Sequence, residues 1–80
     1  MKIIELQKEL DSQLLNDCQN KAVQCEIEIL KQSKSAVMEA IQEYTYMIED
    51  CLLSRDDVSY YRYYHRRDEL YEALKTLSSS

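Results

Sequence analysis

The stretch that decides the fold is VQCEIEILKQSKSAVMEAIQEYTYMIEDC, residues 23–51, in which apolar side chains recur at alternating steps of four and three. Lys34 is the exception in the series. The apolar members are Val23, Ile27, Leu30, Val37, Ile41, Tyr44, Ile48 and Cys51. Such steps place side chains along one seam of an α-helix, and a seam is buried only when another helix packs over it. The sequence therefore predicts a long helix, residues 17–53, that needs a second helix.

The composition favours an all-α protein. The chain has 80 residues with 0 Gly and 0 Pro, the two residue types that punctuate tight turns and strand corners. At this length we expect a single domain, residues 1–80. A core of this size rarely supplies more than about 3–5 kcal/mol, so association with another protein would add useful stability.

A turn is predicted at residues 54–57, where Ser and Asp side chains follow an apolar run and can accept hydrogen bonds from the first amides of a new helix. The second helix is expected at residues 57–77, with residues 78–80 as a short tail. The result is an antiparallel helical hairpin. Its predicted core consists of Val37, Ile41, Tyr44, Ile48, Leu70 and Leu74.

The two predicted helices differ in length. A second helix of about 20 residues spans roughly 30 Å, against roughly 45–55 Å for the first helix. The N-terminal part of the seam then has no cover within the hairpin. This mismatch predicts that Val23, Ile27 and Leu30 face a partner protein.

Residues 1–16 offer an alternative cover, because they form an amphipathic segment. Its apolar residues are Ile3, Ile4, Leu6, Leu10, Leu14 and Leu15. If Asn16 or Asn20 caps a new helix, the segment can fold back as a short third helix and cover part of the seam. The sequence leaves this arrangement and a straight continuation both open. At residues 33–35, Ser side chains that compete for backbone hydrogen bonds predict a kink rather than a full turn.

The charge pattern argues against nucleic acid and membranes as partners. The net charge is −5, and an acidic chain is repelled by phosphate groups. Glu5, Lys8 and Glu9 interrupt the first apolar residues, so neither a signal peptide nor a membrane span is expected. We therefore expect a cytoplasmic protein.

Few residues in the chain are suited to chemistry. Cys18 and Cys25 are seven residues apart, about 10.5 Å along a helix, too far to bridge within one chain but able to pair across a dimer. Core packing is the main expectation for Cys51 and for the other two thiols. With His65 as the single histidine, no metal site is predicted. A thin hairpin offers little concavity, so we expect neither a cofactor nor an enzyme.

Aromatic and basic residues interleave in YYRYYHRR, residues 60–67. Such a mixture can stack bases and contact phosphates, but on a helix these residues spread over every face. Acidic residues also bracket the run. Because Tyr and Arg often supply much of the energy of protein interfaces, a protein recognition surface is the better interpretation.

The segment DVSYYRYYHR, residues 57–66, resembles the second helix of the small co-chaperones of type III secretion needles, the YscE-type family. In that family a Tyr is followed three residues later by another bulky side chain soon after the turn, a spacing matched here by Tyr61 and Tyr64. Apolar residues continue the resemblance at Leu70, Ala73 and Leu77. It covers residues 28–77, whereas a turn without Gly and the N-terminal extension depart from the family pattern.

The resemblance implies a bacterial cytoplasmic protein that pairs with a larger chaperone built of helical repeats. Together the two would hold the needle subunit and prevent its polymerisation, with Tyr61 and Tyr64 in contact with the partner. The alternative is a self-associating coiled-coil adaptor, a homo-oligomer in which a second copy closes the seam.

Overall fold

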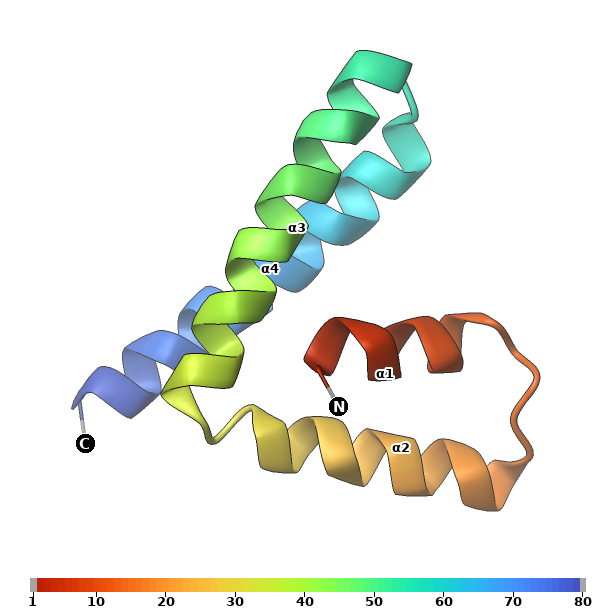
Figure 1. The fold of residues 1–80 in the computed structure, drawn as a ribbon, viewed down its shortest axis with the longest axis vertical. Coiled ribbons are helices and arrows are strands. Elements are labelled where there is room, and N and C mark those ends of the chain that lie inside the picture. The colour runs from red at the N-terminus through yellow and green to blue at the C-terminus, as the bar shows by residue number, and fades with distance from the viewer. Residues whose placement is uncertain (1, 80) are drawn as a thin grey trace.

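The computed structural model describes residues 2–79, which form four α-helices (Figure 1). The helices are α1 (Ile3–Asp11), α2 (Asp17–Leu30), α3 (Lys34–Ser54) and α4 (Asp57–Ser79). Helices α3 and α4 form an antiparallel hairpin, and α1 and α2 form a second hairpin that packs near one end of the first. No strand occurs in the described part of the chain, and the all-α hairpin architecture with an additional N-terminal helix is confirmed.

The predicted single helix over residues 17–53 is wrong, because a full turn separates α2 from α3. After Leu30 the backbone amide of Ser33 donates to the Leu30 carbonyl at 2.9 Å. The Ser33 hydroxyl then accepts from the Ala36 amide at 3.4 Å and caps the start of α3. A serine that can cap a new helix lowers the free-energy cost of a break, and the predicted kink therefore becomes a turn.

The predicted difference in helix length is also wrong. Helix α3 has 21 residues and α4 has 23, so the two cover one another along most of their length. Helix α4 continues through Ser78 and Ser79, which were expected in the tail, and Ser80 lies outside the described residues. The mismatch arose from counting α2 and α3 as one helix.

The turn between α3 and α4 uses no glycine. Arg55 takes the left-handed conformation with φ of 59°, which ends α3. The backbone amide of Asp56 donates to the Cys51 carbonyl at 3.0 Å. The Asp56 carboxylate accepts from the Ser59 amide at 3.2 Å, and these hydrogen bonds with Ser59 hold the pKa of Asp56 below its usual value. The predicted capping role of this acidic cluster is present in the structure.

The main core lies between α3 and α4. Five of the six residues predicted for it are buried, and Leu74 packs partly buried against the same cluster. The five are Val37, Ile41, Tyr44, Ile48 and Leu70. The Tyr44 and Tyr63 rings lie 5.9 Å apart between the two helices. Burial of the phenol raises the pKa of Tyr44.

Helix α1 folds back over the N-terminal part of the seam. Ile3, Ile4 and Leu6 are buried in one cluster with Val23 and Ile27 of α2. The prediction that Val23 and Ile27 face a partner is therefore corrected, since the chain itself covers both side chains. Leu30 is partly buried against the same cluster. Asn16 caps the start of α2, because its side-chain oxygen accepts a hydrogen bond from the Gln19 amide at 2.8 Å. This cap lets a new helix begin after α1.

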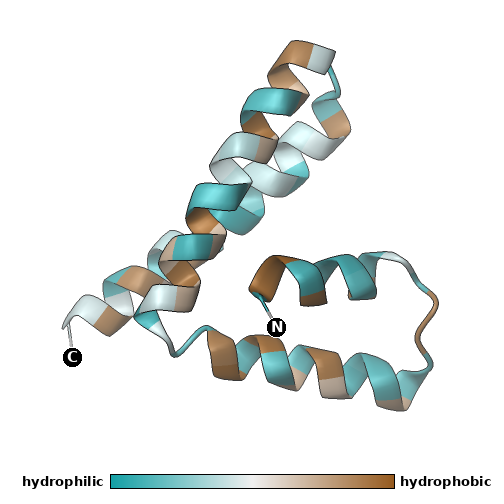
Figure 2. Cartoon of the chain, in the orientation of Figure 1, coloured by the Kyte–Doolittle hydropathy of each residue, from teal (hydrophilic) through white to brown (hydrophobic). Residues whose placement is uncertain are grey.

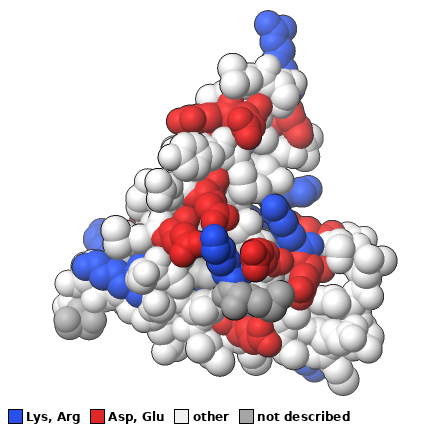
Figure 3. Space-filling view, in the orientation of Figure 1, with Lys and Arg blue, Asp and Glu red and all other residues white. Residues whose placement is uncertain are grey.

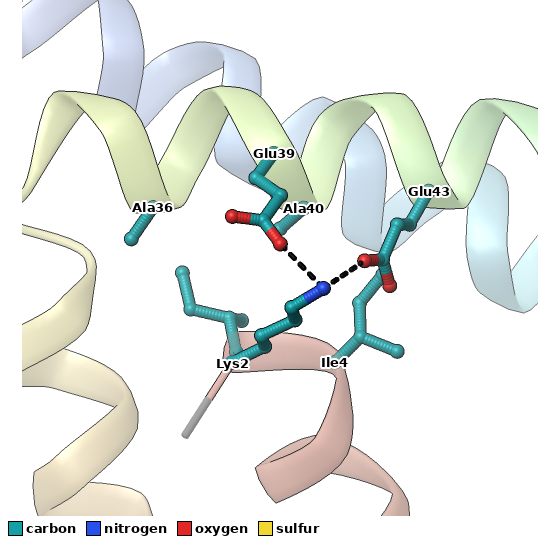
Figure 4. A pocket seen from close by; sticks show the side chains of 7 residues that line it. Lys2, Ile4, Ala36, Glu39, Ala40 and Glu43 are labelled. Atoms are coloured by element: carbon teal, nitrogen blue, oxygen red, sulfur yellow. Dashed lines mark hydrogen bonds and ion pairs between the residues drawn. The ribbon is translucent and has the colours of Figure 1, made fainter.

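Ion pairs hold α1 at both ends. Before its first turn, the Lys2 ammonium lies 2.7 Å from the Glu39 carboxylate and 3.3 Å from that of Glu43, both on α3 (Figure 4). At its last residue, Asp11 accepts two hydrogen bonds of 2.8 Å from the Arg66 guanidinium of α4. These bonds lower the pKa of the Asp11 carboxyl. The two pairs orient α1 relative to α3 and α4.

Replacing Leu6 by Ala should undock α1. Leu6 is 1% exposed, and loss of a fully buried leucine side chain costs about 2–5 kcal/mol. Hydrogen exchange should show that the amides of α1 and α2 lose protection while those at the centres of α3 and α4 retain more of theirs. Leu14→Ala is the control, because Leu14 is 86% exposed. Equal loss of protection in all four helices would contradict two separable hairpins.

The Asp11–Arg66 pair should make stability depend on acid pH. Because the pKa of Asp11 is lowered in the folded state, its contribution is present above the unfolded value of about 4 and is lost as pH falls through the folded pKa. Asp11→Asn should cost about 1 kcal/mol at about pH 7 and less at about pH 3, which lies below the unfolded pKa. Urea unfolding of both proteins at the two pH values measures this difference. A constant difference would disprove the assignment.

Candidate protein interface

The concave places on the surface are small or open. A cavity of about 80 Å³ lies at the junction of α1 and α3, under the Lys2 ion pairs (Figure 4). Drug-sized ligands need about 300–1,000 Å³, so this space suits only a few water molecules. A depression of about 600 Å³ lies over Cys25 and Ile29, but all of its lining residues belong to α2. A single helix cannot enclose a substrate, so we interpret this depression as open surface.

The reactive side chains are scattered. Within residues 2–79, no group of three or more His, Cys, Asp or Glu side chains is arranged to hold a metal ion. His65 lies 3.3 Å from Glu69, and both are well exposed. Cys51 is buried, which raises the pKa of its thiol, whereas Cys18 and Cys25 are exposed on α2. The sequence-based expectation that all three thiols pack in the core therefore holds for Cys51 alone.

Exposed apolar side chains are the more informative feature. Among residues 2–79 ten large ones are exposed, and eight of these belong to α3 and α4. The eight are Met38, Tyr46, Leu52, Leu53, Val58, Tyr61, Tyr64 and Tyr71. In the part of the chain described here, no helix has the length and apolarity needed to cross a bilayer. Apolar side chains that gather on such a surface are typical of a protein interface.

One group surrounds the turn between α3 and α4. Leu52 and Leu53 are 61% and 85% exposed, and Val58 and Tyr61 are 72% and 69% exposed. We call these four residues the hairpin tip. The tip extends beyond the region where α1 and α2 pack, and its α3 side is strongly apolar (Figures 1 and 2).

A second group runs along α4 at steps of four, three and four residues. Its members are Tyr60, Tyr64, Arg67 and Tyr71, which we call the aromatic ladder. The Tyr60 and Tyr64 rings stack with centroids 5.9 Å apart. The Arg67 guanidinium carbon lies 5.2 Å from the centre of the Tyr64 ring and 5.8 Å from that of Tyr71. The guanidinium is therefore held by cation–π contacts with two half-exposed tyrosines.

Arg67 also connects the ladder to α3. One of its terminal nitrogens donates to the Thr45 hydroxyl at 3.1 Å. Its Nε is buried and has no acceptor among the described residues, and none of their carboxylates lies within ion-pairing distance of the guanidinium. Arg66, the preceding residue, is by contrast paired with Asp11. Arg67 is thus a cation on a partly apolar surface without an acidic partner in the described chain.

The ladder and a stripe of α3 together make one face of the main hairpin. The stripe comprises Met38, Thr45 and Leu52, which are seven residues apart and so point the same way. We call the ladder and this stripe the open face. Ala36 and Ala40, which lie against α1, are each two residues from Met38 and therefore lie on the opposite side of α3. Helix α1 covers one face of the hairpin and leaves the other uncovered.

Charged groups gather where α1 meets α3. Figure 3 shows acidic and basic side chains interspersed near the middle of the molecule, where α1 meets α3. The ion pairs of Lys2 with Glu39 and Glu43 belong to this region. These charges are already paired within the chain, in contrast to Arg67.

The residues predicted to bind a partner separate into two groups. Tyr61 and Tyr64 are exposed on α4, whereas Val23 and Ile27 are buried with α1 and Leu30 is partly buried against the same cluster. Sequence reasoning missed Met38, Leu52 and Arg67. A seven-residue spacing beside the core seam was the available signal for Met38 and Leu52. The periodic placement of Arg67 among the tyrosines was the signal for the ladder.

Comparisons with known proteins add no assignment. No protein-family model matches the chain, and it has no significant match among curated proteins or solved structures. The resemblance to the YscE-type family therefore rests on the spacing of Tyr61 and Tyr64 and on the helical hairpin.

The three thiols should separate by reactivity. We expect iodoacetamide at mildly alkaline pH to modify Cys18 and Cys25 rapidly and Cys51 only after unfolding, because Cys51 is 8% exposed and burial raises its pKa. Mass spectrometry should show two adducts in buffer and a third in urea. Cys51→Ala is the control and should give two adducts in both. A third adduct formed at the same rate in buffer would contradict the burial of Cys51.

Proposed function

We propose that this chain is a non-catalytic protein-binding subunit, and specifically a small co-chaperone of a bacterial type III secretion system. In this role it pairs in the cytoplasm with a chaperone built of helical repeats. The pair keeps the needle subunit unpolymerised. The observation that carries the proposal is the exposed hairpin tip, four large apolar side chains on a helical hairpin that is otherwise well packed.

The tip has a suitable shape for such a partner. Helical-repeat proteins form extended concave surfaces, and a projecting pair of helices fits a concave surface better than a flat one. Leu52 and Leu53 contribute aliphatic surface from α3, and Val58 and Tyr61 contribute from α4. Burial of apolar area yields roughly 25 cal/mol per Å², so four such side chains supply a substantial part of a binding free energy. Tyr61 is also one of the two residues that carry the family resemblance.

The role of α1 and α2 differs from the one expected from the sequence. Because α1 covers Val23 and Ile27, partner binding does not require these residues. The N-terminal hairpin instead braces the base of α3 and α4 through the Asp11–Arg66 and Lys2–Glu39 pairs. A braced hairpin loses less conformational freedom when it binds, which favours affinity.

A self-associating adaptor is the second candidate, and one feature of α2 favours it. Cys18, Ala22, Cys25 and Ile29 follow one another at steps of four, three and four on its outer side, and Cys18, Cys25 and Ile29 are exposed. This spacing is that of a short coiled-coil seam. A seam of four residues buries little area compared with the 1,200 Å² or so of a stable interface, so we rank this candidate second.

The test is co-expression of the chain with the helical-repeat chaperone and the needle subunit of the same organism. We expect all three proteins in one complex of defined mass, with the needle subunit protected from fibre formation. Tyr61→Ser should weaken the pairing by about 30-fold, because truncation of a central interface tyrosine costs about 2 kcal/mol. Tyr46→Ser is the matched control, since Tyr46 is similarly exposed but lies outside the tip.

Two results would count against the proposal. Fibres that form equally fast with and without the chain would remove the co-chaperone role. Sedimentation of the isolated chain as a tight homodimer, unchanged by either candidate partner and broken by Ile29→Asp, would favour the adaptor.

A further inference from the structure

We propose that the open face binds an amphipathic helix of a partner protein, and that Arg67 selects a helix with a carboxylate in its apolar stripe. The inference rests on the proposed protein-binding function and specifies the partner's chemistry at a surface that shares Leu52 with the hairpin tip but does not include Tyr61. Its elements are the aromatic ladder of α4 and the α3 stripe of Met38, Thr45 and Leu52.

The dimensions of the open face suit one helix. Helices α3 and α4 run antiparallel, and the groove between two packed helices is where a third helix docks. From Met38 to Leu52 the face extends about 21 Å along α3, which corresponds to about four helical turns of a partner. Met38 and Leu52 are 53% and 61% exposed at its two ends. An apolar stripe on the incoming helix at i, i+3, i+4, i+7, i+11 and i+14 would reach from one end to the other.

The centre of the face supplies charge. Arg67 donates to a neutral hydroxyl through one terminal nitrogen, and no carboxylate of residues 2–79 pairs with it. Its Nε is buried, so a partner's carboxylate would meet the terminal N–H groups. A half-buried guanidinium gains from a carboxylate, which accepts two parallel N–H bonds. Tyr64 and Tyr71 already hold the guanidinium by ring contacts. The cation therefore needs little reorganisation when an acidic partner arrives.

A second copy of this chain fits the face poorly. Arg67 is residue 11 of the 23 in α4, and Thr45 is residue 12 of the 21 in α3, so their contact marks the middle of the hairpin. A two-fold axis through the middle of the face would place Arg67 against Arg67 of the partner copy. Like charges at a buried contact cost several kcal/mol. A different protein with an acidic residue avoids this repulsion.

Nucleic acid is also disfavoured. Tyrosines and an arginine can bind single strands, but Met38 and Leu52 at the ends of the face have no phosphate-binding group. The net charge of −5 adds repulsion at long range.

The experiment selects helix-stabilised peptides from a displayed library on the full chain. The library varies both faces of a helix of about four turns. We expect the recovered peptides that bind the open face to share Asp or Glu at one position, flanked by apolar residues three or four positions away. Replacing that acid by Asn or Gln in a synthetic peptide should weaken its affinity for the wild-type chain by about 10-fold or more. NMR shifts should map the peptide to Met38, Thr45 and Tyr71.

Matched variants isolate Arg67. Arg67→Met should bind the acidic peptide and its amide version equally, whereas Arg62→Met, the same change on the same helix, should keep the wild-type preference. If Arg67→Met loses its helical circular dichroism, Arg67→Lys replaces it. Lysine keeps the charge but not the two parallel hydrogen bonds, so it should retain only part of the preference.

Several outcomes would overturn the inference. These are absence of recovered binders, recovered peptides without a common acid, a preference that survives Arg67→Met, and NMR shifts confined to the tip or to α2. Tighter binding of an oligothymidine at the same face would favour nucleic acid. Tyr61 does not belong to the open face, so these outcomes leave the proposed function to be decided by Tyr61→Ser.

Discussion

The burial of α1 against α2 and α3 is the contact that joins the two hairpins and decides which face of α3 and α4 stays open. Helix α2 packs chiefly on α1, and α1 packs in turn on α3, so α2 is connected to the main hairpin largely through α1. The connection is apolar at its centre, where Ile3, Ile4 and Leu6 are at most 3% exposed. Without it, Val23 and Ile27 would lie open to water, and α2 would be a short amphipathic helix with no face to bury. Isolated helices of this length are marginal in water.

The ion pairs at the two ends of α1 give this contact its direction. Apolar burial has no preferred orientation, whereas the Lys2 and Asp11 pairs accept only one register of α1 on α3 and α4. Because α1 packs on the side of α3 that carries Ala36 and Ala40, the opposite side with Met38 stays uncovered. The two faces of the α3–α4 hairpin thus differ in kind. One face has paired charges over a closed core, and the other has half-exposed tyrosines around an unpaired arginine.

The sequence predicts those features that depend on local chemistry or strict periodicity. The helical class follows from the absence of Gly and Pro, and the turn at residues 54–57 follows from its capping side chains. The sequence predicts only a kink where the structure has a full turn before α3. The reason is that a serine at position 33 is compatible both with a helix cap and with a helix interior. Either residues 3–11 or a partner protein could cover the seam. Sequence periodicity does not favour one over the other, because the outcome depends on tertiary packing. In residues 60–67, the sequence alone does not show that Tyr64 and Arg67 belong to a different surface from Tyr61. That difference depends on how the side chains pack.

The difference in packing between the hairpin tip and the open face explains how a small acidic chain can expose apolar surface and still discriminate between partners. The hairpin tip has four apolar side chains around a turn in which Arg55, Asp56 and Asp57 are exposed, so discrimination there depends on shape and on these flanking charges. The open face has a charge at its middle that costs free energy when covered by a purely apolar helix, because the guanidinium then loses water without gaining an acceptor. A carboxylate turns that cost into a favourable contact. Specificity on the open face therefore depends as much on the partners it rejects as on the partner it accepts.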